Sequence, residues 1–308
     1  MILCCGEALI DMISEPTASG ALGFVPHTGG AVLNTAVAMG RLGVPVGMLT
    51  GLSSDMFGQQ LIDALKASHV DTTHVITSDR PTTLAFVQLS DGHASYSFVD
   101  ENTAGRMLLP EDMPDQLPAV SALYLGGISL ACEPCADAYA ALLDRHGSNR
   151  AVMLDPNIRP DFIKDQTRFR TRLNRMISRA DIVKVSDEDL DWIIPGAESE
   201  SAKASVLLQA GPSVVIVTRG SDGAHGYLAD GSEVSVPVKP VEVVDTIGAG
   251  DTFNAGVLTE LSRAGHLTKS GLRGLTVESL QAAMELGADV AAVTVSRAGA
   301  EPPWSHEL

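Results

Sequence analysis

The alternation of short apolar runs with helical segments constrains the fold of this chain more than any other feature of the sequence. Apolar runs that suit buried strands cover residues 2–5, 44–52, 122–125, 151–154, 182–185 and 214–218. Helical segments lie between them, and a long one covers residues around 277–292. Strands that alternate with helices form a parallel sheet, because each crossover must return the chain to the same end of the sheet. We therefore expect an α/β fold with a doubly wound, Rossmann-like, mainly parallel sheet flanked by helices.

One segment interrupts this alternation. Residues 82–98, TTLAFVQLSDGHASYSF, form two β-rich runs around Asp91-Gly92, a dipeptide typical of hairpin turns. Residues 12–28 lack a helical period and are candidates for further strands of the same unit. We expect one domain over residues 1–308, with a small β-sheet lid from about 12–28 and 80–104. A lid would exclude water from reactive phosphates; a surface hairpin with only a packing role is the alternative.

The charge balance limits the partners. The chain has 21 Lys+Arg against 38 Asp+Glu, a formal net charge of -17. So acidic a surface repels polyanions, which excludes nucleic acid as an expected partner. A nucleotide would have to be bound by local backbone N–H groups and Mg²⁺ rather than by a broad basic field. No apolar stretch is long enough for a membrane span and no basic leader opens the chain, so we expect no membrane partner and a cytoplasmic location.

The four cysteines do not indicate a metal site. Cys4 and Cys5 are adjacent, and Cys132 and Cys135 form a C-x-x-C pair. That pair has no His/Cys partner cluster of zinc-like spacing, and its surroundings are not thioredoxin-like. We expect ordinary reduced thiols.

Residues 245–254, DTIGAGDTFN, carry the strongest local signal for a site. Gly248 and Gly250 remove side chains where a helix begins, so several backbone N–H groups can point into one anion-binding concavity. A carboxylate there, Asp251, would repel a bound phosphate, but it suits proton removal from a hydroxyl that attacks a phosphoryl group. A plain glycine turn capped by Asp251 is the alternative.

Two common nucleotide motifs are absent from the sequence. No G-K dipeptide occurs, which excludes the Walker A lysine and a P-loop mechanism. No G-x-G-x-x-G follows the first apolar run, which disfavours a dinucleotide-dependent oxidoreductase.

Residues 220–233, GSDGAHGYLADGSE, are rich in turn-forming residues.

Several segments resemble one family in the same order along the chain. DTIGAGD resembles the D-T-x-G-A-G-D signature of the ribokinase-like (PfkB) carbohydrate kinases, and GGAVLNTA resembles their G-G-x-x-x-N-x-A helix, although Val32-Leu33 replace the commoner Pro-Ala. GEALIDM, GLSSDMFG, LDPNIRP, TRGSDG and VSRAGAEPP resemble further family segments, so the similarity covers nearly the whole chain. It implies a ribokinase-type fold and ATP-dependent phosphorylation of a sugar hydroxyl with Mg²⁺.

The resemblance also implies roles for particular residues. Asp251 would be the general base, and the N–H groups of Gly248, Ala249 and Gly250 would stabilise the charge of the transferring phosphoryl group. The positions that match sugar-binding residues of the family are Asp11, Gly29, Gly30, Asn34, Arg159 and Asp251. Those that match nucleotide-binding positions are Ser186, Thr218, Gly220, Gly223, Gly248 and Gly250.

The candidate cation sites are less direct matches. The family commonly has N-x-x-E where this chain has Ser186 and Asp189, and Asp189 is expected to influence Mg²⁺ through water. Fructokinase-like members often carry serine at the first of these positions. Some family members bind a monovalent cation such as K⁺ beside the anion hole, and Asp245 and the Ile247 carbonyl match that site. Bracing of the turn by Asp245 is the alternative.

The predicted substrate is D-fructose, phosphorylated to fructose 6-phosphate. GEALIDM, DPNIRP and SDEDL together resemble bacterial fructokinase-type sequences. The guanidinium of Arg159 could bind sugar oxygens or a carboxylate, which makes a 2-keto-3-deoxygluconate kinase the second candidate and a ribokinase the third. A non-catalytic sugar-binding relative is disfavoured because Asp251 is intact. A homodimer through lid strands is a further expectation from the resemblance.

Overall fold

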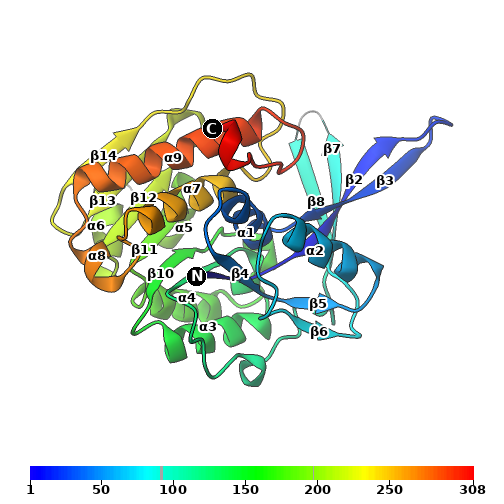
Figure 1. Ribbon diagram of the computed structural model, residues 1–308, viewed down its shortest axis with the longest axis horizontal. Helices are drawn as coiled ribbons and strands as arrows, with labels where there is room; N and C mark the ends of the chain where they lie inside the picture. Colours follow the sequence, from blue (N-terminus) through cyan, green and yellow to red (C-terminus); the bar gives the residue numbers. More distant parts are fainter. Residues whose placement is uncertain (91–92, 197) are drawn as a thin grey trace.

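A mainly parallel sheet of eight strands forms the centre of the computed structural model (Figure 1), which describes residues 1–90, 93–196 and 198–308. The strand order is β14-β13-β12-β11-β10-β9-β1-β4. The strands are β1 (Ile2–Cys5), β4 (Val46–Leu49), β9 (Ala122–Gly126), β10 (Ala151–Asp155), β11 (Ile182–Ser186), β12 (Val214–Thr218), β13 (Ala224–Leu228) and β14 (Glu233–Val236). From β4 to β12 all neighbours pair in parallel, whereas β13 and β14 add antiparallel pairs. The predicted fold class is confirmed.

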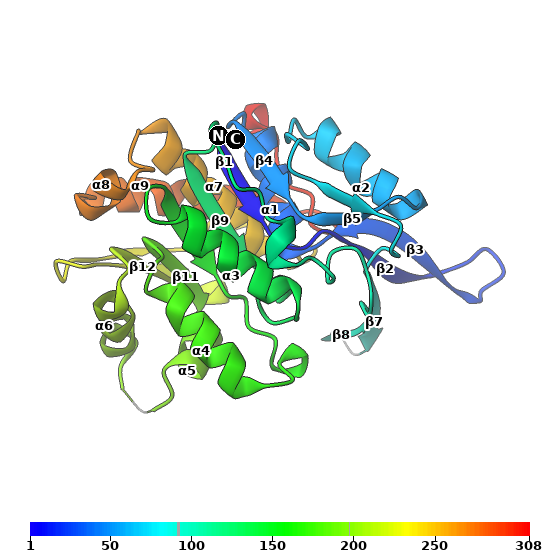
Figure 2. The ribbon, with the colours of Figure 1, turned by 90° about the horizontal axis from the view of Figure 1, so that it is seen from below.

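The sheet carries helices on both faces, and Figure 2 shows α3 and α4 on one side of it. Residues of α1 (Ala31–Arg41), α2 (Met56–Ala67), α7 (Ala249–Arg263), α8 (Lys269–Arg273) and α9 (Val277–Val295) share one apolar core. Residues of α3 (Cys135–His146), α4 (Gln166–Ile177), α5 (Asp187–Ile193) and α6 (Glu200–Ala210) share the other. Strand side chains alternate between the two cores, as the period of a strand requires. Ile182 belongs to the first core and Val183 to the second.

Helix α7 lies unusually close to α9. A Cβ atom on Gly256 would lie 2.6 Å from the Cα of Gly287, so neither glycine leaves room for a side chain at this crossing. The close crossing holds α7 directly against α9. This matters because the predicted anion-binding segment opens this helix.

The sequence prediction missed two strands of the central sheet. Strands β13 and β14 fall within or next to residues 220–233, where glycine and aspartate hide two short extended runs. The Asp55 side chain caps α2 by accepting from the amides of Phe57 and Gly58.

A second, smaller sheet has the order β3-β2-β7-β8 and projects from the main body (Figures 1 and 2). Its strands are β2 (Leu9–Pro16), β3 (Leu22–Gly29), β7 (Leu84–Ser90) and β8 (His93–Val99). Strands β7 and β8 pair antiparallel, whereas the predicted turn at Asp91-Gly92 lies outside the described residues. A separate parallel pair consists of β5 (Gly51–Ser53) and β6 (Ile76–Ser78). In the sequence this pair comes after β2 and β3 and before the β7–β8 hairpin.

The sequence also led to expectations about membrane-spanning helices and about the state of the cysteines. None of the helices that the structure describes combines the length and hydrophobicity that a membrane crossing requires. All four cysteines are buried and carry free thiols. The thiol of Cys135 donates to the carbonyl oxygen of Cys132 at 2.9 Å.

Candidate active site

The carboxyl ends of parallel strands bring polar residues to one edge of the central sheet. Asp155 ends β10, Ser186 ends β11 and Thr218 ends β12, and Ser186 pairs in register with Thr218. The start of α7 reaches the same edge, because the Lys184 ammonium lies 3.3 Å from where a Cβ atom on Gly250 would be. Ligands of open α/β sheets bind at this edge.

The start of α7 leaves backbone donors available. Gly248 caps the helix with φ 78°, a left-handed conformation that glycine adopts without strain. Among the residues that the structure describes, no acceptor is found for the amides of Gly248, Gly250 and Asp251. The Ala249 amide donates to the Thr246 carbonyl at 3.3 Å. The segment can therefore offer three unengaged N–H groups to an anion at a helix N-terminus, where the macrodipole favours negative charge.

Asp251 is buried beside these donors. Its Oδ2 accepts a hydrogen bond from Asn34 Nδ2 at 2.9 Å, and its carbonyl accepts one from Thr35 Oγ1 at 3.0 Å. Burial raises the pKa of Asp251 to about 7; the Asn34 hydrogen bond opposes this rise, Asp155 adds to it and Lys184 opposes it. A carboxylate whose pKa lies near neutrality is suited to accept a proton from a hydroxyl group.

Asp11 lies with the two glycines that precede α1. A Cβ atom on Gly29 would lie 2.0 Å from Asp11 Oδ2, so only glycine fits beside this carboxylate. Gly30, at φ 107°, starts α1, and its carbonyl accepts from the Asn34 amide at 2.9 Å. Burial raises the pKa of Asp11 to about 6. The structure thus brings Asp11, Gly29, Gly30 and Asn34 together, and Asn34 connects them to Asp251.

Glu7 is a buried carboxylate that the sequence prediction did not single out. Its Oε2 accepts from Ser129 Oγ at 2.6 Å and from the Ser129 amide at 3.2 Å. Gly127, at φ 73°, leaves the space for this carboxylate, because a Cβ atom there would lie 1.9 Å from Oε1. The backbone carbonyl of Glu7 accepts from the Leu33 amide at 3.2 Å. Glu7 therefore ties the end of β1 to α1 and to the loop after β9.

A second missed group lies beneath the start of α7. Asp155 Oδ2 accepts from Lys184 Nζ at 3.1 Å and from Asn254 Nδ2 at 2.7 Å. Asn254 Nδ2 also donates to the Tyr124 hydroxyl at 3.0 Å. A signal for this network was visible in the sequence, since Lys184 is a charge in the middle of the apolar strand IVKVS.

Ser186 and Asp189 form a capping box at the start of α5. The Asp189 amide donates to Ser186 Oγ at 3.0 Å, and the Ser186 amide donates to Asp189 Oδ2 at 3.4 Å. Asp189 Oδ1 accepts from the Ile158 amide at 3.0 Å. Both carboxylate oxygens of Asp189 are therefore engaged with backbone. Within the described residues there is no group of three or more His, Cys, Asp or Glu side chains placed to hold a metal ion.

Asp245 braces the anion-binding segment. Its Oδ1 accepts from the Ile247 amide at 3.0 Å and its Oδ2 from the Gly299 amide at 2.9 Å. Gly248 is packed against the same C-terminal segment, since a Cβ atom there would lie 2.6 Å from the Cβ of Ala300. This is the bracing role that the sequence left open for Asp245.

Arg159 is exposed and not engaged with a carboxylate. Its guanidinium donates to the neighbouring Ile158 carbonyl at 3.0 Å, and no ion pair of Arg159 is found in the part of the chain that the structure describes. The structure does not connect it by a hydrogen bond to Asp11, Asn34 or Asp251 there.

The segment after β12 forms a tight turn. Gly220 and Gly223 have φ 50° and 90°, and a Cβ atom on Gly223 would lie 2.3 Å from the Val236 carbonyl oxygen. Thr218 Oγ1 donates to the Val185 carbonyl at 3.4 Å. These residues share the carboxyl edge of the sheet with Ser186 but form no hydrogen bond with α7 in the part of the chain that the structure describes.

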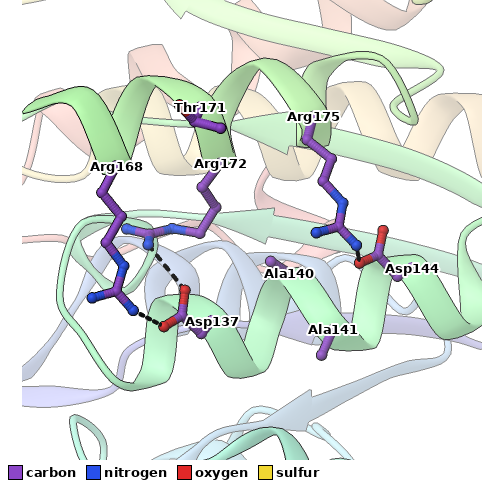
Figure 3. Close-up of a pocket in the computed structure, with 8 residues that line it drawn as sticks. All are labelled: Asp137, Ala140, Ala141, Asp144, Arg168, Thr171, Arg172 and Arg175. Atoms are coloured by element: carbon purple, nitrogen blue, oxygen red, sulfur yellow. Dashed lines mark hydrogen bonds and ion pairs between the residues drawn. The ribbon is translucent and has the colours of Figure 1, made fainter.

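A hollow of about 440 Å³ lies between α3 and α4 (Figure 3). Arginines of α4 extend toward aspartates of α3 across it: Arg168 and Arg172 pair with Asp137, and Arg175 pairs with Asp144. Each of these three arginines is thus paired with a carboxylate across the groove between the two packed helices.

An anion-binding helix start next to a buried carboxylate, at the carboxyl edge of a mainly parallel sheet, is an arrangement suited to phosphoryl transfer to a hydroxyl group. The chain belongs to the pfkB family of carbohydrate kinases, which it matches over residues 1–307. This confirms the family and the sugar-kinase class that the motifs indicated.

Individual relatives are similar over most of their length. A fructokinase of Rhizobium leguminosarum bv. trifolii is 49% identical over 282 residues, which cover 91% of this chain and 86% of the relative. The crystal structure of a fructokinase with bound ATP from Xylella fastidiosa superimposes with a TM-score of 0.89 at 31% identity, covering 99% of this chain and 95% of that one. An aminoimidazole riboside kinase from Salmonella enterica gives a TM-score of 0.82 at 26% identity over 97% and 94% of the chains. The fold alone therefore does not select the sugar.

Proposed function

We propose that this protein transfers the γ-phosphoryl group of ATP to D-fructose and forms fructose 6-phosphate. The observation that carries the proposal is the hydrogen bond between Asn34 and Asp251, at 2.9 Å. It joins the predicted sugar-binding group to the predicted base across 217 residues of sequence. The 49% identity to a fructokinase supports fructose over other sugars.

In the proposed mechanism, Asp251 accepts the proton of the attacking sugar hydroxyl as its oxygen bonds to the γ-phosphorus. Asn34 holds the carboxylate in place, and Asp11, Gly29, Gly30 and Arg159 bind the remaining sugar oxygens. The N–H groups of Gly248 and Gly250, which lack other partners among the described residues, stabilise the charge on the departing phosphate. Ala249 contributes less, since its amide already donates to Thr246.

On the nucleotide side, we assign ATP to the carboxyl edge of β11 and β12, with Ser186, Thr218, Gly220 and Gly223 along it. Mg²⁺ would neutralise the phosphates and be held mainly by them and by water, because both oxygens of Asp189 accept backbone hydrogen bonds. Asp189 then acts on that water at most indirectly. A K⁺ ion beside the segment would take main-chain carbonyls such as that of Ile247, and Asp245, which accepts one amide on each carboxylate oxygen, could also contribute a remaining lone pair.

We also propose a homodimer through the small sheet and a cytoplasmic location, where ATP is available. The sheet exposes Leu22 and Val99 on its outer strands, and β3 and β8 are its two edges. An exposed apolar edge strand gives pairing a physical motive. A single monomeric species in size-exclusion chromatography with light scattering would rule the dimer out.

The test of function is ADP release with Mg-ATP across fructose, ribose, glucose and 2-keto-3-deoxygluconate, with phosphorus NMR to locate the new phosphate. We expect fructose to give the highest kcat/KM and a phosphate on its 6-hydroxyl. Turnover restricted to another sugar would replace the substrate, and sugar binding without ADP release would replace the activity by a sensor role.

A second substrate has one specific observation in its favour. The Arg159 guanidinium is exposed and has no ion pair among the described residues, so it is available to a substrate carboxylate. Under that alternative, 2-keto-3-deoxygluconate is preferred and Arg159→Lys lowers its kcat/KM more than that of fructose, because lysine lacks the bidentate fork.

A further inference from the structure

Lys184 is a buried cation directly beneath the anion-binding segment. Its side chain is 7% exposed and its Nζ lies 3.1 Å from Asp155 Oδ2. Burying an ammonium group is costly unless it is paired, and Asp155 meets this need with one hydrogen bond. The other two N–H bonds of Lys184 have no acceptor among the described residues.

The position of Gly250 shows which region the ammonium group of Lys184 faces. A Cβ atom on Gly250 would lie 3.3 Å from Lys184 Nζ, tighter than most contacts of real Cβ atoms. The absence of a side chain there lets the ammonium approach the first turn of α7. The same residue carries one of the unengaged amides of that turn. Lys184 and the Gly250 amide thus border the same anion-binding region.

The other buried cations of the described chain are used differently. Arg172 pairs with Glu133 and Asp137, and Lys203 pairs with Asp191 at 2.7 Å. Neither has a contact with α7 in the described residues. Lys184 is also surrounded by carboxylates, since it affects the ionisation of Asp251 and Asp189 as well as pairing with Asp155. Without a cation at this point, a triphosphate would approach a group of negative charges.

We propose that Lys184 is a catalytic residue whose ammonium contacts the γ-phosphoryl group of ATP, and that Asp155 and Asn254 are positioning residues that hold it there. This inference rests on the proposed kinase function. As the bond from the γ-phosphorus to the β-phosphate oxygen breaks and the bond to the sugar oxygen forms, the sugar proton goes to Asp251. Lys184 transfers no proton and stabilises the charge on the moving group.

Asp155 and Asn254 hold Lys184 from one side. Asn254 Nδ2 donates both to Asp155 Oδ2 and to the Tyr124 hydroxyl, so the carboxylate is fixed between an amide and an ammonium group. The network reaches from three neighbouring strands to the interior of α7. It orients Nζ toward the helix start rather than away from it.

The experiment compares Lys184→Met with Lys203→Met, which removes a buried, ion-paired lysine far from α7. Affinities for Mg-ATP and Mg-ADP are measured by calorimetry, and kcat is measured with fructose. We expect Lys184→Met to bind ATP about tenfold more weakly while ADP binding changes little, because only ATP carries the contacted group. Its kcat should fall roughly 100-fold. Lys203→Met should change neither, and Lys184→Arg should restore part of the loss.

An unchanged ratio of ATP to ADP affinity in Lys184→Met overturns the inference, whatever its kcat. If that variant does not fold because Asp155 is left unpaired, the double variant Lys184→Met with Asp155→Asn removes both charges and is scored in the same way. Failure of the proposed function gives a different result. A parent protein that turns over no sugar contradicts the kinase proposal, while the ratio of its ATP and ADP affinities still tests the contact of Lys184.

Discussion

Two carboxylates, Asp251 and Asp11, belong to different regions of the molecule and are held in different ways. Asp251 opens α7 on the main sheet, whereas Asp11 lies in β2 of the small sheet. Burial raises the pKa of both, to about 7 and about 6. Asp251 also receives a hydrogen bond from Asn34 and is acted on by Lys184 and Asp155, while burial is the only cause at Asp11. The pKa of Asp251 in the main body therefore depends on burial and on neighbouring groups, whereas that of Asp11 in the small sheet depends on burial alone.

The largest effect is expected from Asp251→Asn. An amide of the same size cannot accept the hydroxyl proton, so kcat should fall about 10³-fold with little change in fold. Steady-state kinetics with fructose measures the loss. The matched control is Asp181→Asn, which changes a buried carboxylate that pairs with Lys269. Activity within tenfold of the parent in Asp251→Asn would refute the assignment of the base.

Asp11→Asn should affect binding more than turnover. If Asp11 accepts hydrogen bonds from the sugar, its loss raises KM for fructose about tenfold and lowers kcat less, because an amide keeps one acceptor and loses the charge. Glu15→Gln, on the same strand and exposed, is the control and should leave KM unchanged. A drop in kcat as large as that of Asp251→Asn would remove the distinction between the two carboxylates.

The strands and helices could be predicted because their signals are local. The run at residues 214–218 coincides with β12, and the glycine-rich start of α7 follows from helix-end chemistry. Strands β13 and β14 escaped prediction because turn-forming residues mask them. Their pairing with β12 is a tertiary preference that short-range patterns do not carry.

Two residues that the motifs single out lie in direct contact in the fold. Asn34 and Asp251 were both expected, but only the fold shows that one donates to the other. Lys184 stood out in the sequence only as a charge inside an apolar strand, because its approach to α7 depends on a glycine 66 positions later and on the register of β10 and β11. Ser186 and Asp189 form a capping box that their match to a family motif does not reveal.

The pH dependence of kcat tests how the neighbours of Asp251 set its pKa. Asp251 must be ionised to act as a base, so kcat should fall as the pH drops below about 7, following its pKa. Asn34→Ala removes a hydrogen bond that lowers the pKa of Asp251, and the midpoint should move to higher pH, with a several-fold loss at neutral pH. Thr35→Val is the control, because Thr35 donates to the backbone carbonyl of Asp251 and not to its carboxylate. Equal profiles for Asn34→Ala and Thr35→Val would contradict the assigned contact.

The smallest effect is expected in stability, where both carboxylates should act in the same direction but over different ranges of pH. Folding raises the pKa of Asp251 from 3.8 to about 7 and that of Asp11 from 3.8 to about 6, so the folded state binds more protons than the unfolded state between these values. The free energy of unfolding therefore falls as the pH rises through each interval, and the loss is complete above the folded pKa.

Replacing Asp251 or Asp11 by asparagine removes that residue's contribution to the loss of stability with rising pH. Asp251→Asn should melt at a higher temperature than the parent at pH 8, with a smaller difference at pH 5, where the parent carboxyl is protonated. Asp11→Asn should show the same sign with a smaller gain, because its pKa is raised less. Differential scanning calorimetry at the two pH values makes the comparison. A larger gain for Asp11→Asn than for Asp251→Asn would mean that the pKa of Asp251 is raised less than that of Asp11, because Asn34 and Lys184 offset more of the effect of its burial.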